Sequence, residues 1–245
     1  MDILLIPGFM LDFDLWRDVL PALESFGDAH HADLSKDSTI EDMAHRALLS
    51  APPVFVVVGF SMGGYVAREI IRQAPHRVIG MILIATSARG DSDVQSRRKT
   101  AVASQDESTS FRKLSGSAVA SSLHPANTDR PDLISRVQNM GIRLGGEVFR
   151  RQSLLRRHDE TSQLSAILCP TLVIAGARDI LRSGEETLEL HLGIPGSEYA
   201  VIQGAGHMVP LEAPEQLGKL ISTWLGQLTL AHSRMSAQGE APGTR

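Results

Sequence analysis

The chain has 245 residues, of which 42% are hydrophobic and 21% are charged, so it can form one large α/β domain or two small ones with a sizeable core. Its formal net charge of −4 argues against nucleic acid as a partner, because binding to the phosphate backbone calls for a basic surface. The single cysteine, Cys169, excludes an internal disulfide framework and favours a reducing compartment.

No apolar run of the sequence is long enough to enter a membrane. The first run, residues 3–6, follows Asp2 instead of a basic segment and stops at Pro7-Gly8, which is typical of a strand and not of a signal peptide. The longest uninterrupted runs, 54–58 and 81–85, are far shorter than the roughly 20 residues of a membrane span. We therefore expect a cytoplasmic protein.

Predicted strands and helices alternate along the chain. In chain order they are a strand at 3–6, a helix at 15–26, a weaker strand at 29–34, a helix at 40–49, a strand at 54–58, a helix at 63–74, strands at 78–85 and 171–175, a helix at 185–192, a strand at 198–202 and a helix at 214–228. Continuous apolar strands suit a parallel sheet buried on both faces. The alternation therefore predicts an α/β fold with a doubly wound, mostly parallel sheet.

Residues 88–165 break this alternation and are predicted as a helical cap insertion. They contain no convincing strand, and their helical stretches, 108–121 and 131–157, are interrupted by Pro and Gly pairs. They carry 13 Lys and Arg against 9 Asp and Glu, a net charge of +4, which leaves −8 for the rest of the chain. The excess arginines either solvate the outer faces of short helices or attract an anionic substrate into a cleft below the cap.

The insertion divides the chain into predicted units. We expect a core built from residues 1–87 and 166–230, with the cap at 88–165 between them. Residues 231–245 are polar, rich in helix breakers and without periodicity, so a disordered and dispensable tail is predicted there.

One serine lies between a predicted buried strand and a predicted helix, in Gly59-Phe60-Ser61-Met62-Gly63. The stretch fits G-x-S-x-G, the nucleophile elbow, in which a strained turn exposes the serine hydroxyl above the sheet. Glycines are needed there because side chains would collide with neighbouring backbone where strand and helix nearly touch. We predict Ser61 as a nucleophile, with a polar residue in an ordinary turn as the alternative.

A serine hydroxyl needs a base, and the base needs an orienting acid. Among nine histidines, only His207 lies on a glycine-rich loop at the end of a predicted strand, and we predict it as the base. Asp179 follows the strand at 171–175 and is the predicted acid. The alternative for Asp179 is a surface aspartate paired with Arg178 or Arg182, in which case the fallback acids are Asp91 and Asp93.

With the chain order Ser61, Asp179, His207, the sequence resembles the α/β-hydrolase superfamily, among its small, cap-bearing serine esterase and lactonase-like members. The resemblance covers residues 2–228 apart from the cap, and its specific stretches are 5–9, 59–64, 176–179 and 206–215. We expect the early antiparallel strands of larger relatives to be missing, so the resemblance implies a sheet of about six strands. It also assigns the backbone N–H groups of Phe9 and Met62 as an oxyanion hole, because Pro7 has no N–H to donate.

The resemblance implies a serine hydrolase that cleaves a small carboxylic ester, a lactone or a thioester through an acyl-enzyme. Met10, Met208 and Val209 are expected to line an apolar substrate pocket, although Met10 and Met208 could equally be plain core. No metal and no organic cofactor is expected. The alternatives are a cofactor-free lyase of the menaquinone-pathway type acting on an anionic substrate, and a non-enzymatic ligand-binding receptor. The oligomeric state is not predicted.

Overall fold

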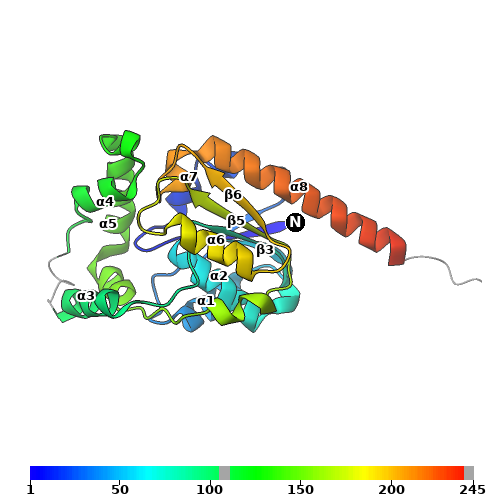
Figure 1. Cartoon of the computed structure of the whole chain (residues 1–245), viewed down its shortest axis with the longest axis horizontal. Coiled ribbons are helices and arrows are strands. Elements are labelled where there is room, and N and C mark those ends of the chain that lie inside the picture. Colours follow the sequence, from blue (N-terminus) through cyan, green and yellow to red (C-terminus); the bar gives the residue numbers. More distant parts are fainter. Residues whose placement is uncertain (105–110, 240–245) are drawn as a thin grey trace, which may run out of the picture.

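The computed structural model describes residues 1–104 and 111–239, in which six parallel strands form one sheet in the order β2-β1-β3-β4-β5-β6 (Figure 1). This confirms the predicted fold class, and every strand runs parallel to its neighbours. The strands are β1 (Asp2–Ile6), β2 (Ala29–His31), β3 (Phe55–Phe60), β4 (Val78–Ile84), β5 (Thr171–Gly176) and β6 (Glu198–Ile202). Their carboxyl ends share one edge of the sheet, where the loops of an open α/β sheet form binding sites.

Both faces of the sheet are buried, which explains the continuous apolar strands. Alternate side chains of β1 separate into two clusters, with Ile3 and Leu5 on one face and Leu4 and Ile6 on the other. The second face is covered by α1 (Ile40–Ser50), α2 (Met62–Gln73) and α6 (Gly184–Gly193), and the first by α8 (Pro214–Gly239). Each fully buried Leu or Ile adds roughly 1.5–3 kcal/mol, so these two clusters hold the sheet rigid under the site.

The predicted helix at 15–26 is wrong. The segment instead forms short 3₁₀ turns, η1 (Phe13–Trp16) and η2 (Leu20–Ala22). Pro21 lies at the start of η2, and in the interior of a longer helix it would lack an N–H and clash with the preceding turn. Trp16 is nevertheless fully buried in the core, and this burial produced the apolar spacing that resembled a helix.

The last helix is longer than its pattern predicted. It was expected to end at residue 228 and to be followed by a disordered tail from 231, but α8 continues to Gly239 and projects from the body of the molecule (Figure 1). Between residues 228 and 239 the sequence has neither Pro nor Gly and contains several good helix formers. The rest of the predicted tail, 240–245, lies outside the described residues.

The predicted cap segment is helical. Its α-helices lie together at one side of the core (Figure 1), whereas its last 3₁₀ turn packs against α6. Its elements are α3 (Asp93–Ser104), α4 (Gly116–Ser122), η4 (Pro125–Asn127), α5 (Pro131–Ser153) and η5 (Thr161–Ala166). The helix expected at 108–121 begins only at Gly116, capped by Ser115, and residues 108–110 lie outside the described residues. The helix expected to reach Arg157 ends at Ser153 and is kinked at Gly145, where φ is +80°.

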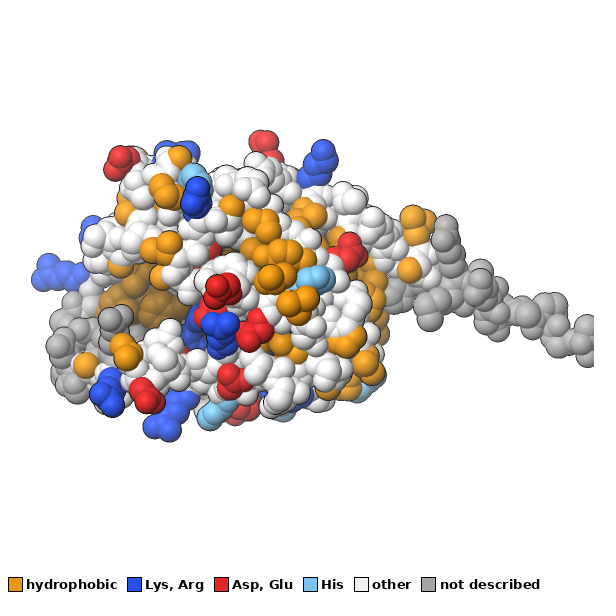
Figure 2. Space-filling model, in the orientation of Figure 1, with side chains coloured by type: hydrophobic (Ala, Val, Ile, Leu, Met, Phe, Trp, Pro, Cys, Tyr) orange, Lys and Arg blue, Asp and Glu red, His pale blue; other side chains and the backbone are white. Residues whose placement is uncertain are grey.

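Several arginines of this segment bind the core instead of solvating a free face. Arg143 donates to Asp12 at 2.7 and 2.9 Å, and Arg136 pairs with Asp14 and with Asp18. The Arg143 pair is partly exposed, and surface pairs of this kind contribute at most about 1 kcal/mol each, so it orients the segment more than it stabilises it. Part of the positive charge of the segment therefore anchors it to the core. On the face drawn in Figure 2, Lys and Arg side chains lie dispersed, several of them beside Asp or Glu, and do not form one basic patch.

Candidate active site

Ser61 lies on a strained turn between β3 and α2. Its φ of +51° is a left-handed value that non-glycine residues rarely adopt. The flanking glycines are required by close packing, as predicted: a Cβ on Gly59 would stand 2.5 Å from the carbonyl oxygen of Gly63, and one on Gly63 would stand 2.4 Å from that of Ile6. The turn therefore points the Ser61 side chain away from the helix, above the carboxyl edge of the sheet.

The hydroxyl of Ser61 is connected to Asp179 through His207. His207 Nε2 lies 3.0 Å from Ser61 Oγ, and His207 Nδ1 lies 2.7 Å from Asp179 Oδ2. The other carboxylate oxygen of Asp179 accepts the N–H groups of Leu181 and Arg182, both at 2.8 Å. Because a carboxylate only accepts, Nδ1 of His207 donates, and Nε2 of the neutral ring is left to accept the serine proton.

Asp179 hydrogen-bonds to His207 and forms no ion pair with Arg178 or Arg182 within the described residues. Its side chain is almost completely buried against His207, and Arg182 meets it through the backbone, not through an ion pair. The fallback acids lie elsewhere: Asp91 binds Lys99 and Arg157, and Asp93 begins α3. Burial alone would raise the pKa of Asp91, but the hydrogen bond from Lys99 and the charge of Arg157 hold that pKa below its usual range.

A glutamate that the sequence analysis left without a role holds the histidine loop. Glu212 accepts the N–H of Gly206 at 2.9 Å through one oxygen, and through the other the N–H of His124 at 2.6 Å and the amide of Asn127 at 2.9 Å. The N–H of His207 donates to the carbonyl of Ser122 at the end of α4. The histidine is thus positioned jointly by the core and by the predicted cap.

The backbone N–H groups predicted to form an oxyanion hole are those of Phe9 and Met62. Met62 is the first residue of α2, where a helix has no internal acceptor for its N–H and carries a partial positive charge. The N–H of Phe9 has no acceptor among residues 1–104 and 111–239, whereas the next N–H, of Met10, donates to Gln152 Oε1 at 2.8 Å. Phe9 and Met62 line the same cavity as Ser61.

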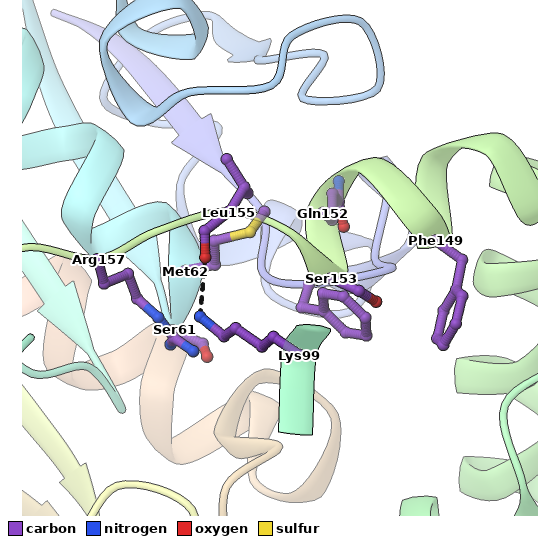
Figure 3. A pocket seen from close by; sticks show the side chains of 9 residues that line it. Ser61, Met62, Lys99, Phe149, Gln152, Ser153, Leu155 and Arg157 are labelled. Carbon is purple, nitrogen blue, oxygen red and sulfur yellow. Dashed lines mark hydrogen bonds between the residues drawn. The ribbon is translucent and has the colours of Figure 1, made fainter. Parts of the chain in front are cut away.

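Ser61 lies at the wall shared by neighbouring cavities. One has a volume of about 370 Å³, and Figure 3 shows its side chains; it is lined by Phe9, Ser61, Met62, Lys99, Phe149, Gln152, Ser153, Leu155 and Arg157. The other, about 350 Å³, contains His207 and shares Phe9, Ser61 and Arg157 with the first. We call them the Met62 lobe and the His207 lobe.

Of the three residues predicted to line the substrate pocket, one lies in a lobe and two lie in the core. Met208 lines the His207 lobe. Met10 and Val209 are fully buried in the core and are absent from the described lining of both lobes. Much of the lining comes instead from α3 and α5 and from the segment after α5, including Lys99, Phe149 and Arg157. No sequence motif predicts these residues, because the spacing of residues within the insertion does not indicate which side chains point toward Ser61.

The serine lies on a turn between a strand and a helix of a parallel sheet, and a histidine connects it by hydrogen bonds to an aspartate. This arrangement is typical of proteins with a nucleophile elbow. The comparison with known families is narrower. The alpha/beta hydrolase family model matches residues 3–219, and the chain belongs to this family. The resemblance inferred from the sequence is therefore confirmed.

Relatives that are similar in sequence carry the name of one esterase. Pimeloyl-[acyl-carrier protein] methyl ester esterase of Edwardsiella ictaluri is 26% identical over 87% of this chain and 89% of the relative. Proteins of the same name from Sodalis glossinidius and Photobacterium profundum are 31% and 35% identical, but those matches span only 37% and 38% of their lengths. These names agree with the expected class, a carboxylic ester hydrolase.

Solved structures of similar fold extend over nearly the whole chain. A thermophilic esterase from Thermogutta terrifontis, solved with malate bound, has a TM-score of 0.79 and 26% identity, covering 93% of this chain and 90% of its own. The enol-lactonase of Burkholderia xenovorans has a TM-score of 0.80 at 19% identity, covering 92% and 91%, and supports the fold alone. In the described part of the chain, no helix has both the length and the apolarity needed to cross a bilayer.

Proposed function

We propose that the protein is a serine hydrolase that cleaves a small carboxylic ester, lactone or thioester through an acyl-enzyme on Ser61. The observation that carries this proposal is the hydrogen-bonded chain from Ser61 through His207 to Asp179, which opens onto the two lobes. The names of the relatives support the same class of bond.

The first half of the reaction forms the acyl-enzyme. Ser61 Oγ attacks the ester carbonyl carbon while its proton passes to His207 Nε2, and Asp179 stabilises the resulting imidazolium. The carbonyl oxygen becomes negatively charged and accepts hydrogen bonds from the N–H groups of Phe9 and Met62. Preorganised donors of this kind are worth about 3 kcal/mol each to the transition state. The intermediate then expels the alkoxide, which takes the proton from Nε2 and leaves as an alcohol.

The second half uses water as the nucleophile. His207 accepts a proton from the water as its oxygen attacks the acyl carbon, and the same N–H groups hold the oxyanion. Collapse of this intermediate returns the proton to Ser61 Oγ and releases the carboxylic acid. Because His207 must reach the leaving oxygen, we assign the His207 lobe to the alcohol part and the Met62 lobe to the acyl part. The apolar side chains of Phe149 and Leu155 then face the acyl chain.

Labelling with a fluorophosphonate and hydrolysis of p-nitrophenyl esters test this proposal. Wild-type protein and the exposed-serine control Ser165→Ala should be labelled and active, and Ser61→Ala should be neither. Full labelling and turnover by Ser61→Ala would refute the assignment. Mass spectrometry of an acid-quenched reaction should find an acyl group on Ser61, which the alternative lyase mechanism does not form.

A further inference from the structure

Arg182 presents a guanidinium to the His207 lobe without a hydrogen bond to an acceptor in the described chain. It follows Asp179 in the loop after β5, and its side chain, only 10% exposed, lines the His207 lobe. The nearest carboxylate oxygen, Glu186 Oε2, lies 3.7 Å from Nη1, too far for a hydrogen bond, and within the described chain no other group accepts from this guanidinium. None of its nitrogens is among the buried polar atoms that lack a partner, so the guanidinium is accessible from the open space of the lobe, where an anion can accept its hydrogen bonds.

Arg157 presents a second guanidinium to the same space. Its Nε donates to Asp91 Oδ1 at 3.1 Å, but its terminal nitrogens meet no acceptor among residues 1–104 and 111–239. Arg157 lines both lobes, and in Figure 3 its side chain extends along the cavity wall toward Ser61. The guanidinium carbons of Arg157 and Arg182 lie 5.6 and 6.0 Å from the centre of the same ring, that of Tyr65.

The two cations are close enough to disfavour each other. Burial, and after it the charge of Arg182, lowers the pKa of the Arg157 guanidinium. Lys99, also on the cavity wall, is already engaged by Asp91 at 2.5 Å and by the carbonyl of Leu155 at 2.8 Å. An anion between the two arginines would satisfy their donors and relieve their repulsion together.

We propose that Arg157 and Arg182 form a carboxylate-binding subsite, so that the preferred substrates carry a carboxylate on the alcohol part of the ester. The inference rests on the proposed function, because the alcohol part of the substrate is assigned to the His207 lobe only if Ser61 is the nucleophile and His207 protonates the leaving group. Guanidinium groups match a carboxylate through paired hydrogen bonds. Asp91 and Glu186 already offset part of the positive charge, which favours a singly charged carboxylate over a phosphate.

A pair of esters differing in one charge tests the subsite. The substrates are 4-acetoxybenzoate and its neutral methyl ester, and the quantity measured is the ratio of their kcat/KM values within one protein preparation. A ratio is independent of the fraction of protein that is folded. Arg157→Gln and Arg182→Gln should each lower it roughly 10- to 100-fold, the effect of losing hydrogen bonds to a charged group. Arg157→Lys and Arg182→Lys should fall between.

The chain offers matched controls in the neighbouring exposed arginines. Arg156→Gln and Arg178→Gln remove a charge next to each subsite residue but outside both lobes, and should leave the ratio unchanged. An equal fall in these controls, or no fall in the subsite variants, would overturn the proposal. So would an arginine-dependent preference for a carboxylate on the acyl part, measured with monophenyl glutarate against its methyl ester.

Binding of the product separates this inference from the proposed function. Calorimetric titration with 4-hydroxybenzoate should show binding to wild-type protein and to Ser61→Ala, and weaker binding to Arg157→Gln and Arg182→Gln. If no ester is cleaved and Ser61 is not labelled, the proposed function fails while the titration still reports on the subsite. If esters are cleaved but 4-hydroxybenzoate binds no better than phenol, the subsite fails alone.

Discussion

Replacing Glu212 with Gln tests whether the predicted cap and the histidine loop are positioned by one side chain. The carboxylate accepts the N–H of Gly206 through one oxygen and that of His124 through the other. Glutamine retains one acceptor oxygen, so whichever way the amide turns, one of these N–H groups faces an NH₂ and loses its partner. A hydrogen bond to a charged group contributes roughly 1.5–3 kcal/mol, and we expect Glu212→Gln to lose about 2–3 kcal/mol of stability.

The same change should slow the reaction. His207 directly follows Gly206, so displacement of the loop moves Nε2 relative to Ser61 Oγ, and a misplacement of about 1 Å can lower a rate 100-fold. We expect kcat to fall about 10- to 100-fold with little change in KM, because Glu212 lines neither lobe. Urea unfolding measures the stability, and hydrolysis of a p-nitrophenyl ester measures kcat and KM.

The matched control is Glu215→Gln, an exposed glutamate in the first turn of α8. It should change stability by less than about 0.5 kcal/mol and leave kcat intact. If Glu212→Gln loses stability but retains wild-type kcat per folded molecule, Glu212 merely packs and does not position His207. If neither stability nor kcat changes, the three hydrogen bonds are not formed in solution.

Three further variants follow from the geometry. Asp179→Asn should lower kcat about 10³- to 10⁴-fold because it disfavours the tautomer that accepts the serine proton, and kcat within tenfold of wild type would contradict the assignment of the acid. Gly63→Ala places a Cβ 2.4 Å from a carbonyl oxygen of β1 and should cost about 2–4 kcal/mol in urea unfolding, whereas Gly226→Ala, with open space on α8, should gain roughly 0.5–1 kcal/mol; equal effects would count against the packing argument. Asp91 has a lowered pKa, because Lys99 and its neighbouring guanidinium outweigh burial, so its contribution to stability is present above its ordinary pKa and is lost as the pH falls through the lower value in the folded protein. Acid unfolding of Asp91→Asn should therefore depend less on pH than that of wild type, and an identical dependence would refute the role of Asp91.

The strands and the elbow were predictable because local patterns determine them. Phe55–Phe60 is apolar throughout since both faces of the sheet are covered, and Gly59 and Gly63 leave a trace in the sequence because no other residue fits. The 3₁₀ turns at Phe13–Trp16 and Leu20–Ala22 were missed because their buried side chains mimic helical spacing. In this segment the spacing of apolar residues indicates only which side chains are buried. The backbone conformation depends on Pro21, which excludes a longer helix.

The substrate-facing residues could not be derived in the same way. Arg157 precedes β5 in the sequence and Arg182 follows it. The fold brings both guanidinium groups close to the Tyr65 ring. Among the many arginines of the predicted cap, the sequence does not distinguish Arg143, bound to Asp12, from Arg157, which faces the cavity. That distinction depends on how the helices pack over the sheet.

The contact between the histidine loop and the end of α4 limits how this enzyme can diverge. A Cβ on Gly206 would lie 2.5 Å from the backbone nitrogen of His124, and the carbonyl of Ser122 accepts the N–H of His207. Residues 122–127 therefore help to position the proposed catalytic histidine, although they belong to the predicted cap. We expect that changes in α3 and α5 can alter specificity, whereas an exchange of the whole insertion that omits 122–127 would also displace His207, the proposed general base.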